Sequence, residues 1–355
     1  MPSPIGNAGV YKFGSPSQGL AVSAQGVNKE DLLDQIVNID PFDTPWVSQA
    51  PKTTAKHVIH QWLIDTLGTT VDTSTAVEGD DYTYADVNSQ PTRDYNVSVI
   101  LRQDIGATET QRAIDSAGFA DLYAYEMQKA TKRLAIKLEK LVFSGATYST
   151  GNSASARQLR SFPTFCVTNT AYAGTNPQGL PAGGTTLQGS AATAGQLSSG
   201  DFNDQLERIY RTGGNPEQVY VSPKVKRQIS AFTLIGSGSA SPFTRNIAAM
   251  DKKLVSAVDF YDTDFGIIQI VLDRWVPESA NSSTAGGSAT DVSGAAFFLQ
   301  RSMNRLAWLR PMTHQFIGKR GDSVAGIVVG EVTLEVLSEK ANGIIKSINN
   351  KSAVT

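Results

Sequence analysis

Three histidines and one cysteine are the side chains with which this chain could most readily bind a metal or attack a substrate. His57 and His60 form an H-x-x-H pair, but on the strand predicted there they point to opposite faces. That spacing suits two ligands on a helix better than two on a strand. The sequence therefore favours solvated or stacked histidines over a metal site.

The other two residues of this kind give no catalytic pattern. His314 has no candidate nucleophile beside it in the sequence, although such partners need be close only in space. Cys166 lies between Phe165 and Val167, an apolar setting that raises the pKa of a thiol. We expect a buried structural thiol. A single cysteine also excludes a disulfide framework and a Cys-based zinc site.

Carboxylates and glycines could still form a calcium-binding loop or a phosphate-binding loop. Glu78-Gly79-Asp80-Asp81 is the densest acid cluster, but it lacks the ligand register of a calcium loop and predicts a solvated tip. The glycine-rich stretches contain no G-x-x-x-x-G-K-[ST] pattern for a phosphate. The sequence thus predicts no catalytic residue, no cofactor and no metal site, and an enzyme is disfavoured. A carboxylate-based enzyme or a sugar-binding protein stays as an alternative.

Composition narrows the class of protein. Of the 355 residues 18% are charged, and 31 Lys and Arg against 33 Asp and Glu give a formal net charge of −2. This excludes a disordered polyelectrolyte and a basic nucleic-acid binder. No apolar run approaches the roughly 18–20 residues of a membrane span, and residues 1–19 lack the apolar region of a signal peptide. We expect a soluble protein made in a cytoplasm, with much of its surface covered by partners.

The charges are unevenly distributed. Residues 57–92 carry six acids and no Lys or Arg: Asp65, Asp72, Glu78, Asp80, Asp81 and Asp86. Residues 301–320 carry five bases and no acid: Arg301, Arg305, Arg310, Lys319 and Arg320. The net charge is therefore a near-cancellation of an acidic and a basic segment.

The clearest predicted element is a long helix over residues 119–143. Apolar residues from Phe119 to Leu141 recur at spacings of 4, 4, 3, 4, 4 and 3, and Gly145 follows the end. Its basic residues lie off this stripe: Lys129, Lys132, Arg133, Lys137 and Lys140. They could face solvent or nucleic acid, and no aromatic residue interleaves them to indicate base stacking.

The other elements are shorter. Residues 1–27 read as an extended arm and 28–39 as a helix. Strands are predicted at 57–67, 93–108, 218–221, 253–261 and 265–272, and residues 295–337 are strand-rich. Helices are predicted from an Asp201 N-cap to Arg211 and from a Ser222 N-cap to Phe232. Residues 161–200, which carry no charge, are predicted to be a meandering loop held by contacts or an insertion, and residues 279–294 a second loop.

Several ordered segments resemble one family of proteins. Residues 40–46 (DPFDTPW) are similar to the P-x-x-T-P-F segment near the start of one family of tailed-phage major capsid proteins. Residues 213–216 (GGNP) with 219–226 (VYVSPKVK) resemble its helix stop, strand and next helix start. Residues 252–266 match its next hairpin, and 330–343 (GEVTLEVLSEKANG) match its C-terminal strand and turn. The matches keep their order over residues 35–350.

The resemblance implies an α+β chain with the Hong Kong 97-type capsid fold, which encapsulins share. Its parts would be an N-terminal arm at 1–50, an extended loop at 51–110, a peripheral domain at 111–200 and 301–355 with the spine helix at 119–143, and an axial domain at 201–300. It implies a non-catalytic shell protein that forms hexamers and pentamers of an icosahedral virion capsid, assembled in the host cytoplasm. An encapsulin-type compartment is the alternative within this fold.

The resemblance also implies partners. These are other copies of the chain, portal and scaffolding proteins, packaged double-stranded DNA bound without sequence preference, and possible decoration proteins, with no membrane. We expect the acidic loop to lie on the basic 301–320 segment of the adjacent subunit. Some related capsids are crosslinked by a lysine on the extended loop, but residues 68–92 contain none, which predicts a non-covalent shell.

Overall fold

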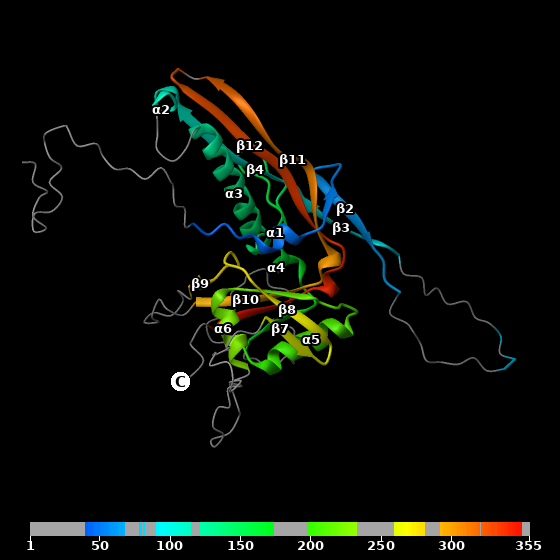
Figure 1. The fold of residues 1–355 in the computed structure, drawn as a ribbon. Coiled ribbons are helices and arrows are strands. Elements are labelled where there is room, and N and C mark those ends of the chain that lie inside the picture. The colour runs from blue at the N-terminus through cyan, green and yellow to red at the C-terminus, as the bar shows by residue number, and fades with distance from the viewer. Residues whose placement is uncertain are drawn as a thin grey trace, which may run out of the picture.

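The computed structural model describes residues 40–67, 78–79, 81, 90–114, 121–173, 197–232, 259–280, 292–319 and 321–349. Figure 1 shows a long sheet with one long helix along it, a second sheet below, and a hairpin that projects sideways from the junction. The predicted arm and the predicted helix at 28–39 lie outside the described residues. The helices in the described part of the chain are too short or too polar to cross a bilayer.

The long sheet has four strands in the order β1-β11-β12-β4. They are β1 (Lys52–Thr54), β4 (Val99–Thr108), β11 (Asn304–Lys319) and β12 (Ser323–Val336). β12 is antiparallel to both of its neighbours, whereas β1 runs parallel to β11. The short helix α2 (Glu109–Ala113) follows β4 at the far end of the sheet.

The long helix α3 (Leu122–Phe143) packs against β4 and β12. Asp121 caps it by accepting a hydrogen bond from the Tyr123 N–H, and Phe119 lies outside the described residues. The predicted end at Phe143 is confirmed. Leu134 and Leu138, both on the predicted stripe, are fully buried. Amphipathic periodicity therefore located this helix correctly.

The second sheet runs in the order β5-β13-β10-β6-β8-β7, with β9 beside β10. Its strands are β5 (Thr170–Tyr172), β6 (Gln218–Val221), β7 (Phe260–Thr263), β8 (Gly266–Leu272), β9 (Ser279–Ala280), β10 (Val292–Leu299) and β13 (Gly343–Asn349). Helices α5 (Ser199–Arg211) and α6 (Pro223–Ala231) pack on it around Phe202, Ile209 and Val225.

One continuous core joins the two sheets. Phe143 at the end of α3 lies 4.9 Å from the Phe297 ring of β10 and 5.9 Å from the Tyr220 ring of β6, measured between centroids. Short connecting turns complete this region: α1 (Pro45–Gln49), α4 (Phe162–Phe165), η2 (Arg301–Met303) and η3 (Glu339–Ala341). The end of α3 is therefore the joint between the halves.

The strand predicted at 93–108 is wrong as a single element. It is two strands, because the chain changes partner at Ser98: β3 (Thr92–Val97) pairs with β2 (Ile59–Ile64), and β4 pairs with β12. The Ser98 N–H and hydroxyl both donate to the Val58 carbonyl, 2.8 and 3.1 Å away. β2 and β3 leave the body as the projecting hairpin, so Ser98 is its corner.

Two predictions about loops and caps are corrected. Residues 161–200 are not a plain loop, because Phe162 and Phe165 bury themselves in the core and form α4, and β5 joins the second sheet. Residues 174–196 lie outside the described part. The N-cap of α5 is Ser198 rather than Asp201; Asp201 sits at the third helical position and completes a capping box with Ser198.

Other predicted elements hold in part. α6 starts at Pro223 after the N-cap Ser222, as predicted. The strand predicted at 253–261 is described only from residue 259, where β7 runs from Phe260 to Thr263. The first residues of the loop predicted at 279–294 form β9, and its last residues begin β10. Residues 281–291 lie outside the described part.

The sheets do not follow the predicted domain limits. β5 and β13 belong to the second sheet, although residues 111–200 and 301–355 were assigned to the peripheral domain. β4 and β1 belong to the long sheet, although residues 51–110 were assigned to the extended loop. The domain assignment stays a prediction. Because each sheet draws its strands from several ranges, membership of a sheet is a clearer criterion for a domain than a continuous range of residues.

Candidate functional site

The histidines form no metal site in the described part of the chain. His57 precedes β2, and its Nδ1 accepts from the Ile59 N–H at 3.2 Å. His60 lies on β2, 3.2 Å from Glu335 Oε2, with its ring 5.8 Å from that of Trp62. No group of three or more His, Cys, Asp or Glu that could hold a metal occurs among the described residues. The His60 and Trp62 rings are tilted by 44° to one another, so the expected stacking is not observed for His60.

His314 and Cys166 have structural settings. His314 Nε2 lies 2.7 Å from the Tyr123 hydroxyl, which joins β11 to α3. Burial raises the pKa of Tyr123 above its usual value, so this hydroxyl keeps its proton at neutral pH. Cys166 is 1% exposed, and burial raises its thiol pKa to about 12. The predicted burial of this thiol is confirmed.

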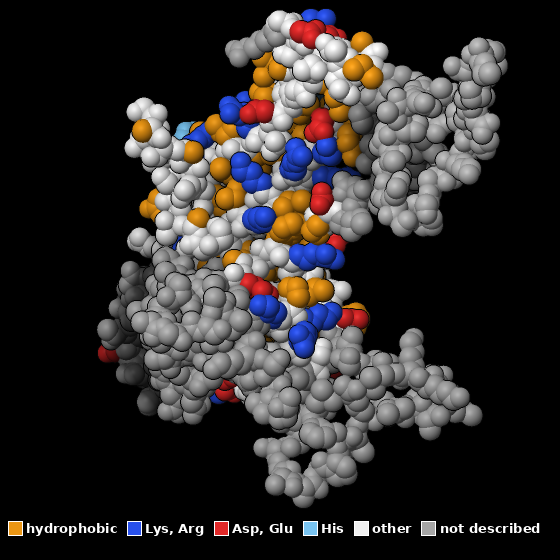
Figure 2. Space-filling model, turned by 90° about the vertical axis from the view of Figure 1, so that its left-hand side faces the viewer, with side chains coloured by type: hydrophobic (Ala, Val, Ile, Leu, Met, Phe, Trp, Pro, Cys, Tyr) orange, Lys and Arg blue, Asp and Glu red, His pale blue; other side chains and the backbone are white. Residues whose placement is uncertain are grey.

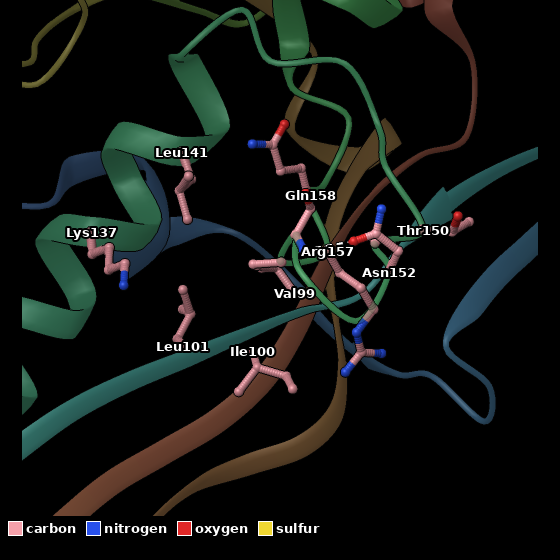
Figure 3. Close-up of a pocket in the computed structure, with 12 residues that line it drawn as sticks. Val99, Ile100, Leu101, Lys137, Leu141, Thr150, Asn152, Arg157 and Gln158 are labelled. Carbon is pink, nitrogen blue, oxygen red and sulfur yellow. Dashed lines mark hydrogen bonds between the residues drawn. The ribbon is translucent and has the colours of Figure 1, made fainter.

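A cavity of about 640 Å³ lies between β4, α3 and the loop at 150–158. Figure 3 shows Val99, Leu101 and Leu141 on its apolar side, with Lys137 and Arg157 nearby. None of its lining residues is an Asp, Glu, His or Cys. A second cavity, of about 690 Å³, has one carboxylate, Glu278, among its lining residues. Neither cavity brings together the two carboxyl groups that a carboxylate-based hydrolase uses.

The projecting hairpin carries the acidic segment. Asp65, Glu78 and Asp81 are exposed, and none takes part in a salt bridge within the described residues. The other predicted acids, Asp72, Asp80 and Asp86, lie outside the described residues. Among the described residues these three acids therefore have no basic partner in an ion pair.

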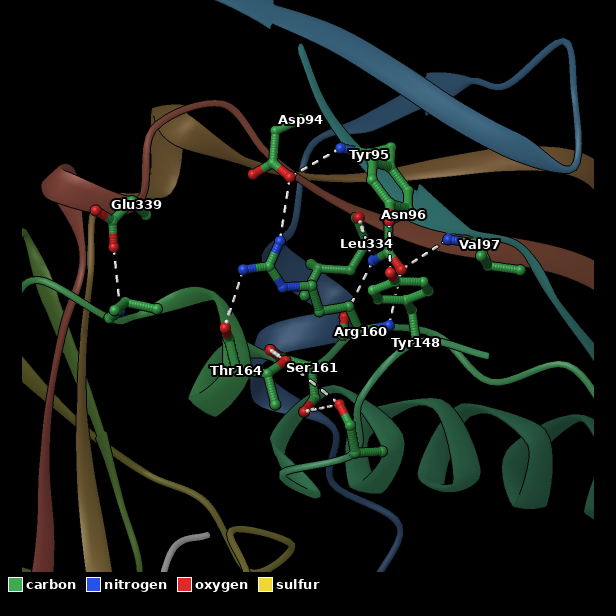
Figure 4. Close-up of polar contacts among 12 residues, drawn as sticks. Asp94, Tyr95, Asn96, Val97, Tyr148, Arg160, Ser161, Thr164, Leu334 and Glu339 are labelled. Carbon is green, nitrogen blue, oxygen red and sulfur yellow. Dashed lines mark hydrogen bonds and ion pairs between the residues drawn. The ribbon is translucent and has the colours of Figure 1, made fainter. Parts of the chain in front are cut away.

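Asn96 fastens this hairpin to the body. Its side-chain amide is fully buried and makes four hydrogen bonds (Figure 4). Nδ2 donates to the Arg160 carbonyl at 3.0 Å and the Leu334 carbonyl at 2.7 Å. Oδ1 accepts from the N–H groups of Arg160 and Val97 at 2.7 and 2.8 Å. One side chain thus ties β3 to β12 and to the segment before α4.

Arg160 extends this attachment on the outer side. Its guanidinium donates to Asp94 Oδ1 at 3.1 Å and to the Thr164 carbonyl at 3.0 Å, and it lies 4.0 Å from the Phe165 ring centroid. Planar stacking and a fixed donor geometry suit arginine to this position. The hairpin therefore leaves the body in a fixed direction. The sequence did not reveal Asn96 or Arg160, because their partners are up to 238 residues away.

The basic segment is partly neutralised within the chain. Arg310 Nη2 lies 2.7 Å from the Oε1 atom of Glu331, which Arg157 also contacts at 3.2 Å. Lys319 Nζ lies 2.7 Å from Glu109 Oε1. Arg301 is exposed and Arg305 half-buried, and Arg320 lies outside the described residues. Of the five predicted contact residues in this segment, two are therefore already paired.

The predicted basic face of α3 is present. Figure 2 shows Lys and Arg side chains in a band down this side of the molecule, with hydrophobic side chains between them. No aromatic residue lies between them in the sequence, but aromatic rings lie beside three of them in space. Lys129 lies 4.6 Å from the Tyr125 ring centroid, and the other two contacts come from distant segments: Lys132 to Phe42 at 4.5 Å and Lys140 to Trp275 at 4.4 Å.

The remaining members of this face differ in exposure and pairing. Lys129 forms a close ion pair with Glu126, and Arg133 lies 4.0 Å from the same carboxylate. Lys137 is exposed beside the cavity between α3 and β4. The band is therefore a mixed surface, part aromatic and part charged.

The segment that leads in from the N-terminus crosses this face. The Asp43 carbonyl accepts from the Trp275 indole N–H at 2.7 Å, and its carboxylate lies 3.7 Å from Arg274. Thr44 and Pro45 start α1, as expected for proline at the first helical position. Trp46 is then buried 5.2 Å from the Phe162 ring, between centroids. The DPFDTPW segment is thus an anchor on the end of α3.

A buried acid completes the anchor. Glu139 of α3 is fully buried, and its Oε1 and Oε2 accept from the N–H groups of Trp46 and Val47 at 2.9 and 2.8 Å. A carboxylate at these first amides of α1 satisfies donors that the helix leaves unpaired. Sequence reasoning missed it, although a Glu three residues before Val142 on the buried side of a helix was a usable signal.

The comparisons with known proteins agree with this architecture. The sequence model of the SU10 major capsid protein family matches residues 17–349. The major capsid protein of Escherichia phage Phieco32 is 21% identical over 287 residues, which cover 72% of this chain and 80% of that protein.

Solved structures share the fold. The capsid protein of the native GTA particle superposes with a TM-score of 0.56 at 12% identity, over 94% of this chain and 100% of that one. The capsid of Myoviridae phage XM1 gives 0.55 at 12%, over 93% and 100%. The holo-SrpI encapsulin of Synechococcus elongatus gives 0.55 at 10%, over 92% and 95%. The predicted α+β fold of the Hong Kong 97 type is confirmed, and the chain belongs to the SU10 major capsid protein family.

Proposed function

We propose that copies of this chain assemble into the hexamers and pentamers of an icosahedral phage head that encloses double-stranded DNA. The observation that supports this most is the capsid-family match over residues 17–349, nearly the whole chain. A hairpin that projects from the body and is fixed at its base suits a subunit that completes its contacts on neighbours. Electron microscopy of the purified protein tests it: closed icosahedral shells are expected, and discrete small oligomers would refute it.

The proposed parts follow the sheets. Residues 1–50 form the arm, and the β2–β3 hairpin within 51–110 forms the extended loop. The long sheet with α3 forms the peripheral domain. The second sheet with α5 and α6 forms the axial domain. This domain then includes β5 and β13, which lie within the ranges 111–200 and 301–355 predicted for the peripheral domain. A density map of the shell would place these parts around the hexamer centre.

The acidic loop is proposed to lie on the basic segment of an adjacent subunit. Because Arg310 and Lys319 are paired within the chain, the contact falls to Arg301, Arg305 and Arg320. Complementary charge of this kind sets register and speeds docking more than it adds affinity. The acids concerned are Asp65, Asp72, Glu78, Asp80, Asp81 and Asp86.

A charge exchange tests this contact. Arg301→Glu should slow shell assembly, and adding Glu78→Lys should restore part of the rate. Arg227→Glu, an exposed site on α6, makes the same charge change elsewhere. An assembled structure with the loop acids more than a Debye length of about 10 Å from every neighbouring Lys and Arg would refute the contact.

The shell is proposed to be non-covalent. Residues 68–92 contain no lysine that could form a crosslink from the loop, and Lys52 and Lys56 lie only at its base. Purified shells boiled in detergent should run as a single monomer band. A ladder of oligomers under these conditions would contradict this proposal.

Packaged DNA is proposed to meet the basic band of α3. A chain of net charge −2 should bind the packaged DNA weakly. Each phosphate that a basic residue neutralises adds salt-dependent affinity, and this chain has no excess of basic residues. Lys137→Gln should then lower the salt at which filled heads lose DNA, while Lys226→Gln on α6 serves as a control. A head structure with Lys129, Lys132, Arg133, Lys137 and Lys140 on the outer surface would exclude the DNA role.

The remaining partners are proposed from the family. They are a portal protein, a scaffolding protein and, as an option, decoration proteins, met during assembly in the host cytoplasm before the chain resides in the virion capsid. An encapsulin-type shell shares the fold but not the family match. Protein cargo without DNA in isolated particles would favour the encapsulin alternative over the phage head.

A further inference from the structure

The cavity of about 690 Å³ lies where the end of α3 meets the start of α6. Its walls come from three separate segments: Lys140 and Ser144 at the end of α3, Pro223 and Lys224 at the start of α6, and residues 274–278 after β8. Three bases and one carboxylate line it, which gives a formal charge of +2. The fold therefore gathers here positive charges that are far apart in the sequence.

Lys140 is held at this cavity by an aromatic ring rather than by an acid. Its Nζ lies 4.4 Å from the centroid of the Trp275 ring, and the Trp275 indole N–H donates to the Asp43 carbonyl at 2.7 Å, which fixes the ring. No salt bridge among the described residues includes Lys140. Because an aromatic face is not a hydrogen-bond acceptor of full strength, the ammonium group can still donate to an anion.

The other two bases each have an acid nearby, but at a long distance. Lys224 Nζ lies 3.6 Å from Glu278 Oε2, and Arg274 Nε lies 3.7 Å from Asp43 Oδ2. Charge-assisted hydrogen bonds between such groups are about 2.7–2.9 Å long. Neither pair reaches that distance, so both bases can donate to a closer acceptor. With Asp43 counted as well, the formal charge of the site is still +1.

The start of α6 adds backbone donors to the same wall. This helix has nine residues, no acid in its first turn, and an N-cap, Ser222, whose side chain makes no capping hydrogen bond. The first N–H groups of a helix have no partner within the helix, and together with the helix dipole they favour an anion. Pro223 and Lys224 both line the cavity, so the first turn of α6 borders it.

We propose that this cavity binds a phosphate group, held by Lys140, Lys224 and Arg274 together with the first turn of α6. A tetrahedral phosphate offers oxygens to donors on several sides, whereas a carboxylate offers two in one plane. The phosphate belongs either to the backbone of a nucleic acid or to a free ion, and the experiment below distinguishes these sources. The inference concerns a single copy of the chain and does not rest on the proposed shell.

Phosphorus NMR titration of the full chain with inorganic phosphate at low ionic strength tests the site. Lys140→Gln and Arg274→Gln should each weaken phosphate binding about fivefold, because each removes one of three charged donors. Lys56→Gln and Arg227→Gln make the same changes at exposed sites outside the cavity and should stay within about twofold of wild type.

Glu278→Gln gives a test of the opposite sign. It removes the carboxylate that lies 3.6 Å from Lys224, and the Oε1 atom of that carboxylate accepts no hydrogen bond among the described residues. Phosphate binding should tighten about threefold, because a like charge leaves the wall of the site. Glu217→Gln, at an exposed site before β6, is the matched control and should leave binding unchanged. A damaged fold could not produce tighter binding.

A duplex titration separates the two sources. If the DNA backbone is the ligand, a duplex of about 12 base pairs should displace inorganic phosphate, and Arg274→Gln should reduce the slope of log affinity against log salt by about 1. If the duplex does not displace it, the site serves a free phosphate. Equal phosphate binding by wild type, Lys140→Gln and Arg274→Gln would overturn the proposal, as would equal displacement of phosphate by acetate at constant ionic strength.

Discussion

Replacing Asn96 with alanine should loosen the projecting hairpin from the body of the molecule. The four hydrogen bonds of this side chain join β3, β12 and the segment before α4, and Asn96 itself has no exposed surface. Alanine would leave two carbonyls and two N–H groups buried without these partners. The corner at Ser98 would lose the contacts that fix its direction.

The expected cost follows from those four bonds. At about 1 kcal/mol each, the loss is about 4 kcal/mol, with the buried unpaired groups tending to increase it. With a urea m-value of about 3 kcal/mol/M, the unfolding midpoint of the unassembled subunit should fall by more than about 1 M. Tryptophan fluorescence can follow it, because Trp62 on β2 lies 6.2 Å from Phe165 across this attachment.

Asn96→Asp tests the reasoning at constant shape. The carboxylate can still accept from Arg160 and Val97, but it cannot donate to the two carbonyls at 3.0 and 2.7 Å. It should cost about 3 kcal/mol at neutral pH, whereas Asn203→Asp, at an exposed site on α5, should cost less than about 0.5 kcal/mol. A near-wild-type midpoint for Asn96→Asp would refute the argument from donors.

Three further predictions concern other buried or capping groups. Cys166, with its pKa raised to about 12, should react with iodoacetamide only after unfolding; fast labelling of the native protein, followed by mass spectrometry, would contradict this. Glu331→Gln should cost about 3 kcal/mol in urea unfolding, because it leaves Arg157 and Arg310 without a charged partner, whereas Arg102→Gln in an exposed pair should cost less than about 1 kcal/mol. Ser198→Ala should cost about 1 kcal/mol through the lost capping box, measured the same way, and Ser198→Thr should recover most of it.

Local patterns predicted the elements whose signals are local. The stripe along α3 and the Ser222-Pro223 start of α6 depend on residues within one or two turns, and both are present. The α5 cap shows the limit of this reasoning. Ser198 and Asp201 are both good capping residues, and the acid suits the third helical position as well as the cap.

The single strand predicted at 93–108 from alternating apolar and polar residues is wrong at Ser98. The alternation argument assumes that only one face of the strand is buried. Asn96, Ser98 and Ile100 share one side of the predicted strand, which reads as solvent-facing. In the structure Asn96 and Ser98 are fully buried, while Ile100 is 45% exposed. The side chain of Asn96 is bonded to residues 160 and 334 and that of Ser98 to residue 58, and only the tertiary fold brings these partners near. No window of the sequence contains that information.

The formal charge of a segment is also altered by ion pairs that only the tertiary fold brings together. These pairs change which residues are available for the proposed contact between subunits. The formal +5 of residues 301–320 includes Arg310 and Lys319, which Glu331 and Glu109 already neutralise from other strands and helices. Glu139 counts as a full negative charge in the sequence, yet it is fully buried, and this burial is the first cause that raises its pKa to about 8. The unpaired positive charge that residues 301–320 can offer a neighbouring subunit is therefore smaller than the formal +5 of the segment. Any docking of the acidic loop on this segment then depends on a few arginines, and single substitutions there should have effects that the segment total would not suggest.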